Sequence, residues 1–321
     1  MIGNFPALFH NCISDLEIME QFGTPAFSFS GAQSKFLPLI DQANLINASH
    51  GLNGKFYTRQ TDKNAPHNLT VDLGGIVASL TGISGAKDMG WTFSDIAATG
   101  AEGNDLLAAT AETTRLATLG EVDRQEAMKA TLALQSAFKL NTVELTQSID
   151  FLNSVENQTS TTLQDLVEAI PKAGPVVKSL GGDVKDLALY LTAMKEGGVN
   201  ASEGANAIKS SLASLINPTK VAKEMFTGFG IDIDQIVTTN AGNLTATITA
   251  LQDSLDKLDP LSKSRAIEQL FGKFQYARMS ALFENLGKEG SQTLQVMDLM
   301  KASATDLANI SSRELGMMTE S

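Results

Sequence analysis

The sequence places one nucleophile close to one base, with His10 and Cys12 two residues apart in the segment HNC. A histidine that deprotonates a cysteine produces a thiolate nucleophile, but this chemistry also needs a group that orients the base and donors that hold an oxyanion. Residues two apart point away from each other on a helix, and no third partner is evident. A small buried apolar residue is the better interpretation of Cys12, and we predict no catalysis here.

Metal ligands are also scattered. The histidines His10, His50 and His67 do not form a His-x-x-x-His pattern, and no calcium-binding loop occurs. Asp232 and Asp234 alternate in the segment GIDID, where side chains more often face solvent. We predict no metal site.

Glycine and carboxylate patterns do not indicate a site either. Gly82 and the run 85–87 (Gly-Ala-Lys) lack the spacing of a phosphate-binding loop. The 36 acidic residues leave room for a carboxylate pair of the glycosidase type, but no pair stands out and a solvated charged face explains them better. The sequence therefore predicts no catalytic, cofactor-binding or metal-binding residue, no cofactor and no enzyme.

The net charge and the cysteine content exclude some classes of partner and of stabilising site. The formal net charge is −12, from 36 acidic and 24 basic residues, whereas a nucleic-acid grip needs clustered Lys and Arg. A single cysteine excludes an internal disulfide framework and a cysteine-rich zinc site. We expect no stable nucleic-acid binding.

Membrane and export signals are weak. The most apolar segment, Asn68–Ala86, contains Asp72 and several Gly, Ser and Thr residues, so a spanning helix is not expected. The first residues have no basic start followed by an apolar stretch, as a secretory signal would. We predict no transmembrane segment.

The elements that would position any site fall into two regions. Residues 1–70 hold the cysteine, all three histidines and many loop residues, and we predict an irregular N-terminal region with one helix near Ser34–Ala48. Any strand should be confined to short pieces before Asn68 and near Ile231–Thr239. Hydrophobic residues make up 43% of the chain but aromatic residues only 6%, which favours a core of small aliphatic side chains.

Residues 71–321 show helical periodicity and helix-capping residues, so the predicted fold is all-α, an elongated array of helical hairpins. Asp183 should cap a helix that runs to Glu196 and stops at Gly197–Gly198. Further signals are a cap at Asn200 or Ser202, a helix end before Pro218, Asp259 before Pro260, and an apolar stripe of Ile267, Leu270, Phe271 and Phe274.

The stretch Ser214–Leu244 is a joint between two helical groups. Pro218 interrupts one helix, Gly230 suits a backbone conformation that other residues resist, and the β-favouring run Ile231–Ile233 follows. Asp232 can hydrogen-bond the turn behind it. No side chain in this stretch suggests catalysis.

The order of elements from Gly181 to Gly287 resembles the core region of bacteriophage tail tape measure proteins. The resemblance lies in a helix opening with Gly and Ala turns, a proline break, a Gly-Ile-Asp turn, a Gly-Asn-Leu entry and a helix ending in Leu-Phe-Gly. The matching residues are Gly198, Ala201, Glu203, Gly204, Ala207, Leu212, Pro218, Gly230, Ile231, Asp232, Gly242, Asn243, Leu244, Leu261, Leu270, Phe271 and Gly272.

This resemblance implies a structural protein of a phage or prophage tail, made in the host cytoplasm and found in the virion. The implied partners are the tail tube protein, tail tip or baseplate proteins and tail assembly chaperones, with several copies arranged symmetrically. Tape measure proteins resemble long helical rulers, and 321 helical residues would span about 480 Å. The Gly and Pro breaks prevent that extension, so we expect a fragment, a truncated prophage product or the core of a larger protein.

Two other classes stay open on the sequence alone. An exported filament or secretion-apparatus subunit would share the acidic, Ala-, Thr- and Asn-rich composition, but such proteins usually have heptad helices at both ends. A cell-wall hydrolase would need an active site that the sequence does not show. Neighbouring genes for a tail tube and assembly chaperones would separate the first class from these.

Overall fold

The computed structural model describes residues 26–30, 57–59, 68–72, 92, 95–96, 99 and 103–320. The chain forms two compact units. The first comprises Met1–Thr118, Asp123–Met128 and Met318–Ser321, and the second Leu119–Val122 and Lys129–Met317. The predicted helix at Ser34–Ala48 lies outside the described residues.

The first unit contains a small antiparallel sheet of β1 (Ala26–Ser30), β2 (Tyr57–Arg59) and β3 (Asn68–Asp72). The strand order is β1-β3-β2, with β3 hydrogen-bonded to both neighbours. Strands before Asn68 were predicted, but β3 begins at that residue and extends past it. The division predicted at residue 70 falls inside β3, and this division stays a prediction.

The helical part of the first unit includes most of α5 (Gly103–Leu119), the start of α6 (Arg124–Phe138) and the end of α17 (Ala304–Glu320) from Met318 onward. The side chains of Leu106, Ala109 and Leu116 are buried along α5. Arg124 at the start of α6 forms an ion pair with Asp95, with 2.6 Å between Nη1 and Oδ2.

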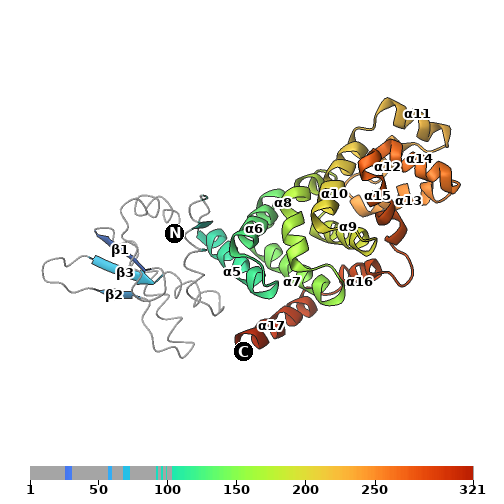
Figure 1. Ribbon diagram of the computed structural model, residues 1–321. Coiled ribbons are helices and arrows are strands. Elements are labelled where there is room, and N and C mark those ends of the chain that lie inside the picture. Colours follow the sequence, from blue (N-terminus) through green and yellow to red (C-terminus); the bar gives the residue numbers. More distant parts are fainter. Residues whose placement is uncertain are drawn as a thin grey trace. The chain divides into compact units, whose positions relative to one another are not determined.

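The second unit is built entirely of helices among its described residues, which confirms the predicted all-α class (Figure 1). After the rest of α6, its elements are α7 (Thr142–Gln158), α8 (Leu163–Ser179), α9 (Val184–Glu196), α10 (Ala201–Ile216), α11 (Lys220–Gly228), α12 (Ile233–Thr239), α13 (Leu244–Leu255), α14 (Pro260–Phe271), α15 (Lys273–Asn285), α16 (Gln292–Leu299) and α17 (Ala304–Glu320).

Helix α9 is the centre of the second unit, because α7, α8, α10, α15 and α16 all pack against it (Figure 1). Ten of its 13 residues are buried. Its sequence VKDLALYLTAMKE has apolar side chains on every face of the helix, and such a helix is stable only when neighbours cover it all round.

The predicted helix boundaries around α9 are confirmed. The Asp183 carboxylate accepts hydrogen bonds from the backbone N–H groups of the first turn, at 2.8 and 3.1 Å. The helix ends at Glu196, and Gly198 follows with a φ of 84°. Asn200 caps α10, and Asp259 caps α14 with proline at the first helical position.

The prediction of an extended piece near Ile231–Thr239 is wrong, because α12 occupies Ile233–Thr239. The Asp232 side chain caps this helix by accepting a hydrogen bond from the Gln235 N–H at 2.9 Å. A cap and the burial of Ile233 outweigh the weak intrinsic preference of isoleucine for strands.

The predicted apolar stripe along α14 is wrong at its last member. Ile267, Leu270 and Phe271 are buried, but the Phe274 side chain is 89% exposed. Gly272, with a φ of 87°, ends α14, and Phe274 lies in the first turn of α15, so it no longer continues the same helical face.

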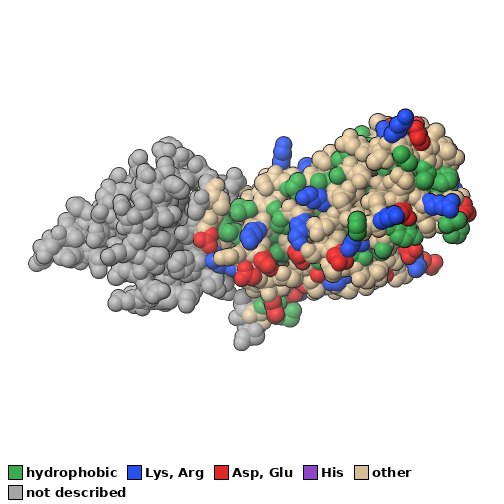
Figure 2. All heavy atoms as spheres, turned by 45° about the horizontal axis from the view of Figure 1, so that its top comes forward, with side chains coloured by type: hydrophobic (Ala, Val, Ile, Leu, Met, Phe, Trp, Pro, Cys, Tyr) green, Lys and Arg blue, Asp and Glu red, His purple; other side chains and the backbone are tan. Residues whose placement is uncertain are grey.

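Charged side chains of both signs are interspersed on the face that Figure 2 shows, without a large basic block in its coloured part. Several pair locally, such as Lys223 of α11 with Asp234 of α12 at 2.6 Å. Exposed pairs of this kind contribute little to stability. Of the helices that the structure describes, none combines the length and apolar character that crossing a bilayer requires.

Candidate functional site

The joint predicted between two helical groups is a pair of short helices, α11 and α12, between α10 and α13. Thr219, directly after Pro218, caps α11 by accepting a hydrogen bond from the Ala222 N–H at 3.2 Å. Helix α11 packs on α14, and α12 packs on α10 and α13. Only Ala222 and Phe226 of α11 and Ile233 of α12 are buried, so a few apolar side chains anchor the pair.

The turn between α11 and α12 depends on Gly230, whose φ is 74°. Its N–H donates to the Thr227 carbonyl at 2.9 Å, and the Ile231 N–H donates to the Phe226 carbonyl at 2.9 Å. This closes the C-terminus of α11 with a residue in the left-handed region, as predicted. The predicted role of Asp232 is wrong in direction, since its side chain bonds the helix ahead of it and not the turn behind.

The far end of the joint touches the turn between α8 and α9. Gly181 has a φ of 79°, and a Cβ placed on it would lie 2.3 Å from the Gly242 Cα atom. The two backbones therefore approach more closely than any side chain allows. Asn243 then caps α13, accepting from the Ala246 N–H at 2.9 Å.

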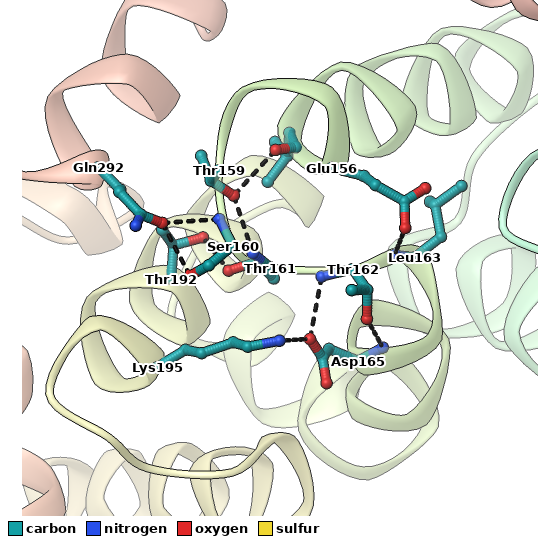
Figure 3. Close-up of polar contacts among 11 residues, drawn as sticks. Glu156, Thr159, Ser160, Thr161, Thr162, Leu163, Asp165, Thr192, Lys195 and Gln292 are labelled. Atoms are coloured by element: carbon teal, nitrogen blue, oxygen red, sulfur yellow. Dashed lines mark hydrogen bonds and ion pairs between the residues drawn. The ribbon is translucent and has the colours of Figure 1, made fainter.

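A second polar site, which we call the polar junction, joins the turn between α7 and α8 to the C-terminal end of α9 and the N-terminal end of α16 (Figure 3). The Gln292 side-chain oxygen accepts from the Ser160 N–H at 2.7 Å and from the Ser160 hydroxyl at 2.9 Å. The Gln292 backbone N–H donates in turn to the Glu196 carboxylate at 3.1 Å. The junction connects three helix ends through hydrogen bonds.

Lys195 and Asp165 supply the ion pair of the polar junction (Figure 3). Asp165 also accepts from the Thr162 N–H at 2.9 Å, which makes it part of the cap of α8. Burial alone would raise the pKa of the Asp165 carboxyl. The hydrogen bonds from Lys195 and Thr162 outweigh burial and hold this pKa below its usual value.

Glu156 lies on the opposite side of the same turn and has the opposite electrostatic character. Its carboxylate accepts from the Leu163 N–H at 2.9 Å. Burial, together with the nearby carboxylates of Glu314 and Asp165, raises the pKa of Glu156, while the Leu163 hydrogen bond and Lys195 act in the other direction.

Helix α9 also carries buried polar side chains that bind its neighbours. Thr192 and Thr161 lie 2.9 Å apart through their hydroxyl oxygens. Asp186 accepts a hydrogen bond from the Thr245 hydroxyl, which also lies 3.3 Å from the Tyr190 hydroxyl. Burial raises the pKa of Asp186 and also that of Tyr190. These contacts fix α9 against the turn between α7 and α8 and against α13.

These groups hold helices together and do not form a reacting set. The Ser160 hydroxyl donates to an amide oxygen, and Lys195 is paired with Asp165, so neither a base nor an amine is directed at a nucleophile. The part of the chain that the structure describes has no group of three His, Cys, Asp or Glu side chains that could hold a metal. His10, Cys12, His50 and His67 lie outside it.

Sequence reasoning did not find the polar junction. The only local signal is the Thr162–Asp165 spacing, a capping-box pattern that marks a helix start. Gln292 and Ser160 are 132 positions apart, so their contact follows from the packing of α16 and α7 and not from any local pattern.

The described second unit is thus an all-helical array in which polar groups connect helix ends. The chain belongs to the phage-related minor tail protein family, whose pattern matches residues 77–272. It is also similar to the tape measure protein of Pneumococcus phage Dp-1, with 22% identity over 214 residues. That match covers 67% of this chain but only 18% of the phage Dp-1 protein. No solved structure matches the chain.

Proposed function

We propose that this phage tail protein acts as a folded tape-measure core during tail assembly, inside the tail tube, without catalysing a reaction. The observation that carries the proposal is the family match over residues 77–272, which includes the joint and every residue of the polar junction except Gln292. Both sites set angles between helices, and fixed angles are what a subunit needs in order to repeat the same contacts in an assembly.

The proposed partners follow from this role. They are the tail tube protein, the tail tip or baseplate proteins and the tail assembly chaperones, with several copies of the chain arranged symmetrically. Synthesis in the host cytoplasm would precede incorporation into the virion. The net charge of −12 and the interspersed charges in Figure 2 support a protein that does not grip DNA passing close by.

The length-setting role of a ruler and the role of a folded core make different demands on the chain. A ruler tolerates internal deletions and gives shorter tails, because length depends on the number of residues. A folded core loses its packing when a helix is removed, because α7 supports α9 and α8. The second behaviour is what we propose.

In-frame deletions within Gln125–Leu152 test the proposal in an infected or induced host, with tail lengths measured by electron microscopy. We expect complete tails to be absent, because the deletions remove parts of α6 and α7. The exposed substitution Lys129→Arg serves as the control and should give normal tails. Complete tails that shorten in proportion to the residues deleted would contradict the folded-core role.

A further inference from the structure

Helix α17 is long but little buried. It has 17 residues, and among those whose side chains are described, Ala304 to Met318, only Leu307 and Ser311 are buried. An isolated helix of this length is marginal in water. Its position in the second unit therefore depends on a small set of contacts.

Hydrogen bonds join α17 to α7. The Asn153 side-chain amide donates to the Glu314 carboxylate at 2.8 Å and lies 3.4 Å from the Ser311 hydroxyl. The Asn157 amide donates to the same Glu314 oxygen at 2.9 Å. Ser311 and Glu314 are three residues apart, so they lie on one face of α17. We call this pair of amides on α7 the α17 seat.

The α17 seat is imperfect. Asn153 is fully buried, yet its side-chain oxygen has no hydrogen-bond partner among the described residues. A buried acceptor without a partner has lost its hydration and gained no bond in return. The Glu314 carboxylate also lies near that of Glu156, which has the same charge. Both features lower the free energy needed to separate α17 from α7.

The segment before α17 is a short hinge with its own helix cap. Residues 300–303 connect α16 to α17, and the Lys185 amine donates to the Met300 carbonyl at 3.3 Å. The Ser303 hydroxyl accepts from the Asp306 N–H at 3.2 Å and donates to the Asp306 carboxylate at 2.7 Å. This cap is local to α17, so it would move with the helix.

We propose that α17 is an exchangeable arm, which leaves the α7 of its own chain and docks in the same way on the α7 of a second copy. The seat and the arm lie on separate elements of one chain, so a second copy offers the same amides to Glu314 and Ser311. Exchange preserves these hydrogen bonds, and exchanging an identical element between copies is a low-cost route to a dimer. Reciprocal exchange gives a dimer, and one-way exchange gives a longer assembly.

Cross-linking of two singly labelled full-length chains tests the exchange, independently of the proposed tail function. In a Cys12→Ser background, one chain carries Asn153→Cys and the other Ser311→Cys, and a short bis-maleimide joins thiols that come close. We expect a cross-linked heterodimer on a denaturing gel whose yield rises with protein concentration, since exchange between chains is bimolecular.

Ser312→Cys is the matched control, because Ser312 neighbours Ser311 but is exposed. It should give a several-fold lower yield with the same Asn153→Cys partner. Repeating the mixture with Asn157→Cys uses an exposed position of the seat, where the substitution does not disturb the core. The exchange is refuted if both seat positions cross-link no better to Ser311→Cys than to Ser312→Cys, or if products form only within one chain in a doubly substituted protein.

Discussion

Helix α9 and the α11–α12 pair share the same local start and stop signals but differ in how much of each helix is buried. Both begin at well-formed side-chain caps and end near glycine, but ten residues of α9 are buried whereas α11 buries two and α12 one. The caps define where each helix starts, and burial decides how much it contributes to stability. Helix α9 holds the second unit together, and the α11–α12 pair sets the direction of the chain between α10 and α13.

This difference implies that mutations in the two regions should affect the protein in different ways. A change in α9 removes packing that five neighbouring helices share. A change in the joint alters backbone geometry while most of the core stays intact. Measured stabilities of matched substitutions separate these two behaviours.

The largest effect is expected from Leu189→Ala in α9. Leu189 is fully buried, and truncating a buried leucine costs about 2–5 kcal/mol of the free energy of unfolding. Val221→Ala in α11 is the control, because Val221 is 57% exposed and should change stability by less than about 0.5 kcal/mol. Urea unfolding followed by far-UV circular dichroism measures both, and equal losses would show that α9 is not the centre of stability.

The sequence predicts those features that depend on residues close together in the chain, such as helix caps and glycine turns. The caps at Asp183, Asn200 and Asp259 and the stop at Gly198 were predicted, because a cap involves residues within one helical turn. The positive φ of Gly230 was predicted for the same reason. These local signals were sufficient to predict the all-α class.

The errors arose where several signals competed or where contacts are distant. Pro171 and Pro175 lie inside α8, on its exposed side, although proline usually ends a helix, so the prediction of a helical region at 71–321 gave no bounds for this helix. Periodicity places Phe274 on the apolar stripe of α14, because it does not show that α14 ends at Gly272 and that a new helix, α15, begins after it. The polar junction depends on tertiary packing, which no local pattern contains.

A smaller effect is expected at the joint from Gly230→Val. Nothing lies within 4 Å of a Cβ built on Gly230, so the cost comes from the φ of 74° alone, about 1–3 kcal/mol. Gly228→Val, two residues earlier, also has open space but no positive φ, and should change stability by less than about 0.5 kcal/mol. If the two variants unfold at the same urea concentration, the left-handed turn does not hold the joint.

Two acidic side chains at the turn between α7 and α8, Asp165 and Glu156, differ in the direction of their pKa shifts. Asp165 is held charged by Lys195, and its pKa is lowered. Glu156 is penalised by burial when charged, and its pKa is raised. Linkage between proton binding and folding gives the two residues opposite pH dependence.

The smallest effect is expected from Glu156→Gln, and its sign depends on pH. The folded-state pKa of Glu156 lies above its usual 4.5, so its favourable contribution is fully present below that value and is lost as pH rises through the folded pKa. The glutamine variant stays neutral and can still accept from the Leu163 N–H. It should therefore be more stable than the unmodified chain at pH 7, and this advantage should shrink as pH falls toward 4.5.

The Asp165→Asn variant should instead be less stable than the unmodified chain at pH 7. This deficit in stability should narrow as pH falls through the lowered pKa of Asp165. Urea unfolding midpoints from pH 7 down to below pH 3.8, the usual pKa of an aspartate, measure both differences. A Glu156→Gln advantage that grows on acidification would contradict the assigned burial of the carboxylate.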